Sequence, residues 1–177
     1  MNTRLLFVAF IVSFSQSFGQ TAETFLQLGL DFNQFENYNL AINNFDKAIK
    51  LNPNLTEAYL NRAYAKAELK KYEDAIIDYN KVLEFDPKNA NAFCGRGMAK
   101  NGLKNYQAAL EDLNTTIILD SNYQMAYAAR GITKHDLKDK IGSLKDYNKA
   151  LELDSTDIKC NYNRGRIKYE MGDLKDA

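Results

Sequence analysis

The sequence contains few of the residues that build catalytic centres. Its 177 residues include one histidine, His135, and two cysteines, Cys94 and Cys160. No His, Cys and carboxylate group has the spacing of metal ligands, and no glycine-rich phosphate loop is present. We therefore predict that the chain is not an enzyme, with no catalytic residue, no cofactor and no metal. His135 is expected to be a solvated surface side chain.

An excess of charge of either sign is also missing. Basic and acidic residues number 23 each, and no block of like charge occurs. Binding to a phosphate backbone or to anionic lipid depends on a positive field that this composition does not supply. Nucleic acid is therefore not expected as a partner.

Only one long apolar run is present, over residues 5–14. Arg4 precedes it, and the small residues Ser17 and Gly19 follow it, which is the layout of a secretory signal peptide. We interpret residues 1–19 as such a signal and predict an exported protein, periplasmic or secreted, whose mature chain has no membrane span. A buried N-terminal helix is the alternative interpretation.

A strict period of 34 residues organises the remainder of the chain. An Arg recurs with this period, and a Lys recurs four residues after it. The residues are Arg62, Arg96, Arg130 and Arg164, with Lys66, Lys100, Lys134 and Lys168. The period divides the sequence from residue 22 into units 22–55, 56–89, 90–123 and 124–157, followed by a partial fifth unit, 158–177.

Each unit repeats the same template of small, aromatic and turn residues. The eighth residue is always tiny: Gly29, Ala63, Gly97, Gly131 and Gly165. The fourth residue of every full unit is aromatic: Phe25, Tyr59, Phe93 and Tyr127. Pro53 and Pro87 stand at the thirty-second place. The period, and the residue types at these places, resemble those of the tetratricopeptide repeat.

Apolar spacing within a unit predicts two amphipathic helices, for example over 56–69 and 72–85. One such hairpin cannot bury both of its faces, so neighbouring hairpins must stack. The fold class expected from this, together with the resemblance, is an all-α, right-handed α-solenoid of helix-turn-helix hairpins with a concave groove.

The repeated Arg departs from the family pattern, which has Leu at that place. Its positive charge must be balanced by an acidic side chain. Asp78, Asp112 and Asp146 recur on the second helices, one for each Arg of the full units that carry one. In the first unit the Arg, Lys and Asp places hold Leu28, Phe32 and Asn44, so cation and anion disappear together. We predict a structural ladder of Arg–Asp pairs made by Arg62, Arg96, Arg130 and Arg164 with the three Asp residues. A ligand-binding row of Arg is the alternative.

The resemblance implies that the fifth and ninth residues of each unit line the groove and contact a partner. These residues are Leu26, Leu30, Leu60, Tyr64, Cys94, Met98, Ala128, Ile132 and Tyr162, together with Arg166. The wall they form is mostly apolar. Family members that clamp a peptide carboxylate carry Lys and Asn at these two places in their first unit, and none of the four full units here does. Packing against neighbouring helices is the alternative role for each of these side chains.

The two cysteines lie 66 residues apart, which places them two stacked units from each other. That separation is too long for a disulfide, so free thiols are expected. The fifth unit lacks most of its second helix, and we expect its first helix to expose an apolar face that includes Ile167 and Met171. Self-association through this uncapped end is one expected consequence.

These features favour an exported scaffold that binds a protein or peptide in its groove. Two alternatives stay open. In the first, the chain is the N-terminal sensory or regulatory part of a larger truncated protein, such as a kinase or peptidase. In the second, it is a structural oligomerisation module.

Overall fold

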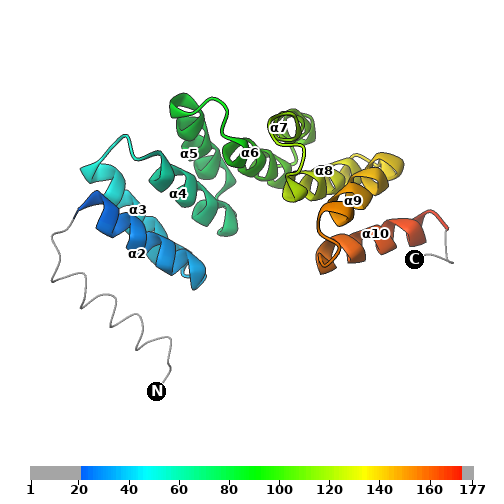
Figure 1. Cartoon of the computed structure of the whole chain (residues 1–177), viewed down its shortest axis with the longest axis horizontal. Coiled ribbons are helices and arrows are strands. Elements are labelled where there is room, and N and C mark those ends of the chain that lie inside the picture. The colour runs from blue at the N-terminus through cyan, green and yellow to red at the C-terminus, as the bar shows by residue number, and fades with distance from the viewer. Residues whose placement is uncertain (1–20, 173–177) are drawn as a thin grey trace, which may run out of the picture. The chain divides into compact units, whose positions relative to one another are not determined.

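A computed structural model describes residues 21–172, and the predicted signal peptide lies outside this range. Between residues 21 and 172 the structure contains nine α-helices and no strand (Figure 1). The predicted all-α repeat fold is confirmed. None of these helices has the length and apolarity that crossing a bilayer requires.

The helices divide into two compact units, one on each side of the boundary between Pro87 and Lys88. The first unit contains four of them: α2 (Ala22–Gln34), α3 (Tyr38–Leu51), α4 (Thr56–Glu68) and α5 (Tyr72–Phe85). Each helix packs against the next along the chain, and α2 also contacts α4. The second unit contains five: α6 (Ala90–Gly102), α7 (Tyr106–Leu119), α8 (Gln124–Asp136), α9 (Lys140–Leu153) and α10 (Ile158–Glu170). Sequential packing holds here too, and α6 contacts α8.

The turn between the two helices of a hairpin has the same backbone conformation in the four hairpins whose two helices are both described. One residue of each turn adopts a positive φ, between 58° and 68°, and Gly172, after α10, has a φ of 84°. The four are Glu36, Lys70, Lys104 and Lys138. The next residue's N–H then donates to a carbonyl five residues back, as from Asn105 to Lys100 at 2.9 Å. This is the bond that closes a Schellman-type helix end.

Side-chain caps mark the start of several first helices. Asn89 accepts a hydrogen bond from the N–H of Ala92 at 2.9 Å, and Asp157 accepts one from the N–H of Cys160 at 2.9 Å. Short polar side chains satisfy N–H groups that the first turn of a helix leaves without a partner. The sequence therefore sets where these helices begin.

The tiny eighth residues let the two helices of a hairpin approach closely. A Cβ added at Gly29 would collide with the Phe45 ring, and one at Gly97 would lie 2.9 Å from Leu113 Cγ. At Gly131 the Tyr147 ring is 3.2 Å away. The tiny residue is thus fitted to a large side chain on the facing helix.

The core of each unit lies between its helices. In the first unit Phe32, Phe45 and small alanines form it. In the second, Tyr147 packs with Cys160 and Ile167. The expectation that Ile167 faces water is wrong, because its side chain turns toward this core and is 0% exposed. Met171 is exposed, as expected.

Candidate functional site

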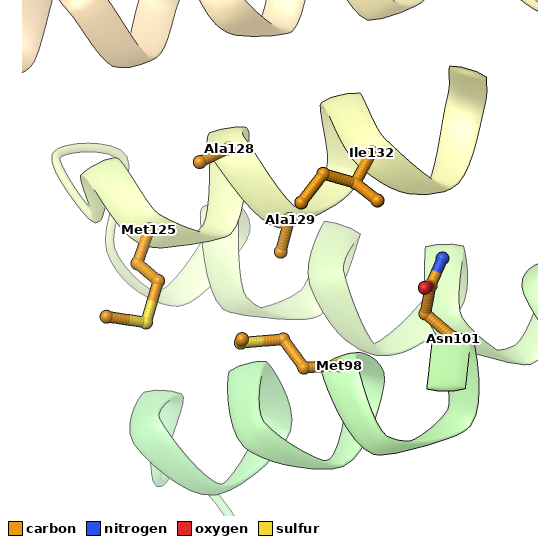
Figure 2. A pocket seen from close by; sticks show the side chains of 6 residues that line it. All are labelled: Met98, Asn101, Met125, Ala128, Ala129 and Ile132. Atoms are coloured by element: carbon orange, nitrogen blue, oxygen red, sulfur yellow. The ribbon is translucent and has the colours of Figure 1, made fainter. Parts of the chain in front are cut away.

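An apolar groove opens between the first helices of the second unit. Met98 lies on α6, and Met125 and Ile132 lie on α8, and all three side chains are exposed. With Ala128 they line a cavity of ≈ 160 Å³, across which the two methionines face each other (Figure 2). Met125, Ala128 and Ile132 follow helical spacing, so one face of α8 supplies most of the wall.

A single polar side chain, Asn101, lies at one end of the groove (Figure 2). Its Nδ2 donates to Thr133 Oγ1 at 3.0 Å and to Asp136 Oδ2 at 3.4 Å. Because the amide N–H₂ is engaged, the Oδ1 atom is left as the hydrogen-bond acceptor of this side chain. The groove therefore combines a large apolar wall with one fixed acceptor.

The predicted groove residues lie at different depths. Tyr64, Met98, Ile132 and Tyr162 are exposed, whereas Leu30, Leu60 and Ala128 are half-buried. Leu26 (9% exposed) and Cys94 (2%) lie in the two cores. The expectation that these two contact a partner is wrong, because neighbouring helices already cover them.

Sequence reasoning missed Met125 and Asn101. Both share a helix face with residues that it named, since Met125 lies three residues before Ala128, and Asn101 three residues after Met98. The 3.6-residue period, extended one turn in each direction, is the signal that could have found them.

The corresponding face of the first unit is aromatic. Tyr64 packs edge-on against Tyr38, with ring centroids 6.2 Å apart. Burial, together with nearby Glu68, raises the pKa of the Tyr64 hydroxyl to about 12. This hydroxyl is therefore a neutral donor at physiological pH.

Away from the grooves, three charged clusters recur at the hairpin crossings. In each cluster, the Nε and Nη2 atoms of Arg donate hydrogen bonds to the two carboxylate oxygens of Asp, which makes a bidentate pair. The distances are 2.8 and 2.6 Å for Arg62–Asp78, 2.8 and 2.7 Å for Arg96–Asp112, and 2.9 and 2.6 Å for Arg130–Asp146. The fourth Arg, Arg164, donates instead to the neutral side chains of Asn148 and Asn161.

The same Asp also binds the repeated Lys, which sequence reasoning did not predict. The Lys–Asp distances are 2.7 Å for Lys66–Asp78, 2.7 Å for Lys100–Asp112 and 2.8 Å for Lys134–Asp146. One buried carboxylate thus binds two cations.

The third guanidinium nitrogen reaches back to the preceding hairpin. Arg62 Nη1 donates to Asp46 at 2.5 Å, and Arg130 Nη1 donates to Asn114 at 2.7 Å. Each of these two Arg residues therefore joins the second helices of two successive hairpins. Burial by itself would lower the pKa of Arg62, but the bonds to Asp78 and Asp46 outweigh it and raise that pKa.

An aromatic ring completes each cluster. The Arg62, Arg96 and Arg130 guanidinium carbons lie 5.4, 5.3 and 5.5 Å from the ring centroid of the aromatic residue three positions earlier. Such contacts are cation–π interactions. In the first hairpin, Leu28, Phe32 and Asn44 are buried at the equivalent places without any charge.

His135 is not the solvated side chain that the sequence suggested. Its Nε2 lies 3.1 Å from Glu170 Oε2, and its side chain is 17% exposed. Lys140 Nζ also donates to the Glu170 carbonyl at 3.1 Å. The correction has a simple cause, because α10 packs over this part of the α8–α9 hairpin.

Both cysteines are buried free thiols, as predicted. Burial raises the pKa of each thiol to about 12. No group of three His, Cys, Asp or Glu side chains in residues 21–172 is arranged to hold a metal ion.

Comparison with known proteins identifies the repeat. Residues 22–55 and residues 56–89 each match a family model for the tetratricopeptide repeat. The chain contains tetratricopeptide repeats. No curated protein sequence matches the chain.

Solved structures show the same fold. TTC0263, a thermophilic tetratricopeptide-repeat protein of Thermus thermophilus, is 19% identical with a TM-score of 0.77, covering 88% of this chain and 86% of that one. A MamA fragment from Desulfovibrio magneticus RS-1 is 21% identical with a TM-score of 0.75, covering 89% of each chain. The first repeat domain of Spaghetti (RPAP3), bound to the HSP90 peptide SRMEEVD, is 26% identical with a TM-score of 0.63, covering 66% of this chain and 93% of that one.

Proposed function

We propose that this protein is a tetratricopeptide-repeat scaffold that holds a partner protein by a large apolar side chain, inserted into the groove of Met98, Met125 and Ile132. The observation that carries the proposal is the size and lining of this groove. A cavity of about 150 Å³ with apolar walls accepts a benzene-sized group, and this one measures ≈ 160 Å³. A Leu, Met or Phe side chain matches that volume.

The lining supports a peptide ligand rather than a small polar molecule. Methionine is flexible and polarizable, so two facing methionines adapt to different apolar side chains. The Asn101 carbonyl oxygen at the groove's end suits a backbone N–H of the same bound segment. The groove thus offers one anchor pocket and one acceptor for the main chain.

The bound segment is internal rather than a free carboxyl terminus. The Spaghetti domain is seen with an HSP90 peptide. The Lys and Asn that family carboxylate clamps use are replaced here by Leu, Tyr, Cys, Met, Ala and Ile at the fifth and ninth places of the full units. An apolar wall gains nothing from a terminal carboxylate, which would lose its hydration on binding.

Methionine methyl signals give a direct test. Three of the chain's four methionines, Met98, Met125 and Met171, follow residue 19, so ¹³C-methyl labelling of a product that begins at Gln20 gives three signals. Titration with N-acetyl-leucine methylamide and N-acetyl-phenylalanine methylamide is expected to shift Met98 and Met125 and to leave Met171 unchanged. Ala128→Trp, which fills the cavity, should abolish both shifts. Equal shifts at Met171, or none at Met98 and Met125, would contradict the proposal.

A free carboxylate tests the internal-segment part separately. N-acetyl-leucine with its carboxylate should bind no more tightly than the methylamide. Tighter binding of the carboxylate form would indicate a clamp for chain termini instead.

We also propose that the protein is exported, on the basis of the sequence of residues 1–19. Expression of the whole chain in a bacterial host should give a product that begins at Gln20. Mass spectrometry of the intact product measures this, and a product that retains residues 1–19 would exclude cleavage there.

A further inference from the structure

The groove of the second unit is lined by two side chains that an oxidant can convert from apolar to polar. Met98 on α6 and Met125 on α8 face each other across it (Figure 2). They are 43% and 51% exposed, so small molecules in the solvent reach both side chains. The first repeat carries Leu30 at the place of Met98, which is also apolar but contains no sulfur. The ability to change polarity is therefore a property of this groove in particular.

The two thiols of the chain do not compete for the same oxidant. Peroxide reacts with the thiolate form of cysteine, and only where the sulfur is accessible. Cys94 and Cys160 are both buried, and burial raises the pKa of each thiol to about 12. Both thiols are therefore protonated and covered at physiological pH, which leaves the exposed methionines as the sulfur groups that react.

The reaction of methionine with hydrogen peroxide adds one oxygen atom to the thioether. The sulfur lone pair attacks one peroxide oxygen and the O–O bond breaks, and the second oxygen leaves as water with the two protons. The sulfur is thus oxidised by two electrons, and the peroxide is reduced by two. The product is methionine sulfoxide, a polar side chain whose oxygen accepts hydrogen bonds.

The side chains that line the groove offer no free donor to such an oxygen. Six of them line it in the described structure, and Asn101 is the only one of the six with N–H groups. Its Nδ2 already donates to Thr133 and to Asp136. A sulfoxide oxygen is therefore hydrated while the groove is empty and loses that water when an apolar side chain enters, which costs free energy. A sulfoxide that turns outward to keep its water removes its part of the apolar wall instead.

We propose that Met98 and Met125 form a redox-sensitive modification site, at which oxidation by a peroxide closes the groove to apolar side chains and reduction reopens it. The change is reversible, because reductase enzymes remove the sulfoxide oxygen as water, with two electrons and two protons taken from a dithiol. This inference rests on the proposed function, since it concerns the same groove and assigns the regulation of its binding.

The test compares binding before and after treatment with hydrogen peroxide. N-acetyl-leucine methylamide is the probe, and the ¹³C-methyl signal of Ile132, which lines the groove and does not oxidise, reports its binding. Peroxide is removed once peptide mass spectrometry shows Met98 and Met125 as sulfoxides. We expect the Kd of the probe to rise by roughly tenfold or more, the scale for a buried polar group without a partner.

Two variants assign the effect to the groove. Met171 is 46% exposed and caps the C-terminal end of α10, outside the groove, so Met171→Leu should respond to peroxide as the native protein does. Met98→Leu/Met125→Leu has an apolar wall without sulfur, so its own Kd should be equal before and after treatment. A rise in the Kd of this double variant equal to the native rise would overturn the inference.

Reversal and protection give two further measurements. Treatment of the oxidised protein with two reductases, one for each sulfoxide epimer, should restore the original Kd. Saturating probe should slow the oxidation of Met98 and Met125 but not that of Met171, because binding and modification exclude each other and this coupling is reciprocal. A Kd that stays high after reduction, or equal oxidation with and without the probe, would contradict the inference.

The outcomes separate this inference from the proposed function. If the untreated protein binds the probe and its Kd is the same after oxidation, the inference is overturned and the proposed function stands. If the untreated protein does not bind the probe, the proposed function fails and the inference fails with it. Urea unfolding should have the same midpoint before and after oxidation, because the oxidised side chains are exposed. A lower midpoint would attribute the lost binding to unfolding and would also overturn the inference.

Discussion

At the scale of single residues, the charged clusters specify how helices cross. Asp146 is almost fully buried and accepts from Arg130 and Lys134, both of which are mostly buried as well. Desolvation of three charges costs much of what their attraction returns, so the cluster is a weak source of net stability. Loss of the Asp is a different matter, because both cations then remain buried without their shared counter-charge.

This asymmetry gives the first prediction. Asp146→Ala should lower the free energy of unfolding by about 3 kcal/mol, the scale for breaking a buried ion pair. The triple variant Arg130→Leu/Lys134→Phe/Asp146→Asn, which copies the first hairpin, should lose much less, because replacing every charged member of a buried cluster leaves no unpaired charge. Urea unfolding measures both. A triple variant less stable than Asp146→Ala would show that the charges themselves stabilise the hairpin.

The tiny residues give a second prediction at this scale. Gly29→Ala should destabilise by about 1–3 kcal/mol, because the new Cβ would collide with the Phe45 ring. Gly131→Ala should be nearly neutral, because a contact at 3.2 Å with Tyr147 is offset by the higher helix propensity of alanine. Ala63 already occupies this place in the second repeat. Thermal and urea unfolding should rank Gly29→Ala as the worse variant, and a reversed order would contradict the packing explanation.

Residue spacing alone was enough to anticipate which Arg meets which Asp, since partners lie 16 residues apart in every cluster. It did not reveal that Lys shares the Asp, because a sequence period does not show how many donors one carboxylate accepts. Residue spacing also did not predict how deeply each side chain is buried. Cys94 and Tyr162 stand at the same place of their repeats, yet one is buried and the other exposed.

At the scale of elements, α10 depends on contacts at both of its ends. Its N-terminal cap is Asp157, which accepts from the N–H of Cys160 at 2.9 Å and from Gln124 Nε2 at 2.7 Å. Near its other end, Glu170 binds His135 and Lys140. The apolar period predicted a helix here but not the side on which Ile167 lies, because that side depends on the position of α9.

The cap gives a prediction for pH. The hydrogen bond from the Cys160 backbone lowers the pKa of Asp157 below its ordinary value of 3.8. A carboxylate whose pKa is lower in the folded state than in the unfolded state stabilises the fold at any pH above its unfolded-state pKa. This stabilisation is lost as the pH falls through the folded-state pKa. Exchange of the α10 amides should therefore accelerate relative to the rest of the chain as the pH falls below about 3.8.

Asp157→Asn is the matched control, because Asn also caps helices but does not titrate. Glu170, whose pKa is lowered by its bond to His135, titrates in the same direction in both proteins. The difference between the two proteins therefore isolates the cap. If Asp157→Asn showed the same acid response as the native protein, the cap would not be its source.

At the scale of the whole molecule, stacked repeats open in parts, since each hairpin is stabilised chiefly by its neighbours. The thiols report this opening at two places in the second unit. Cys94 on α6 packs in a core with Leu113 and Ala126, whereas Cys160 is on α10. A thiol with a pKa of about 12 is almost entirely protonated at pH 8, so alkylation waits for opening.

Pulsed alkylation across a urea series should modify Cys160 at lower urea than Cys94. Mass spectrometry of the two cysteine peptides measures the order, and full unfolding of both provides the reference rate. Modification of both thiols at the same urea concentration would indicate that the second unit opens as one cooperative body.

The contacts that join successive hairpins have a consequence for how such a chain could grow. Each described positive-φ turn lies inside its own 34-residue block. The contact to the preceding block recurs at the same place, from Arg62 to Asp46 and from Arg130 to Asn114. An in-frame duplication of residues 90–123 would accordingly insert a cassette whose two junctions already fit. The number of repeats in such a protein can therefore change by duplication of one block, without new contacts between blocks.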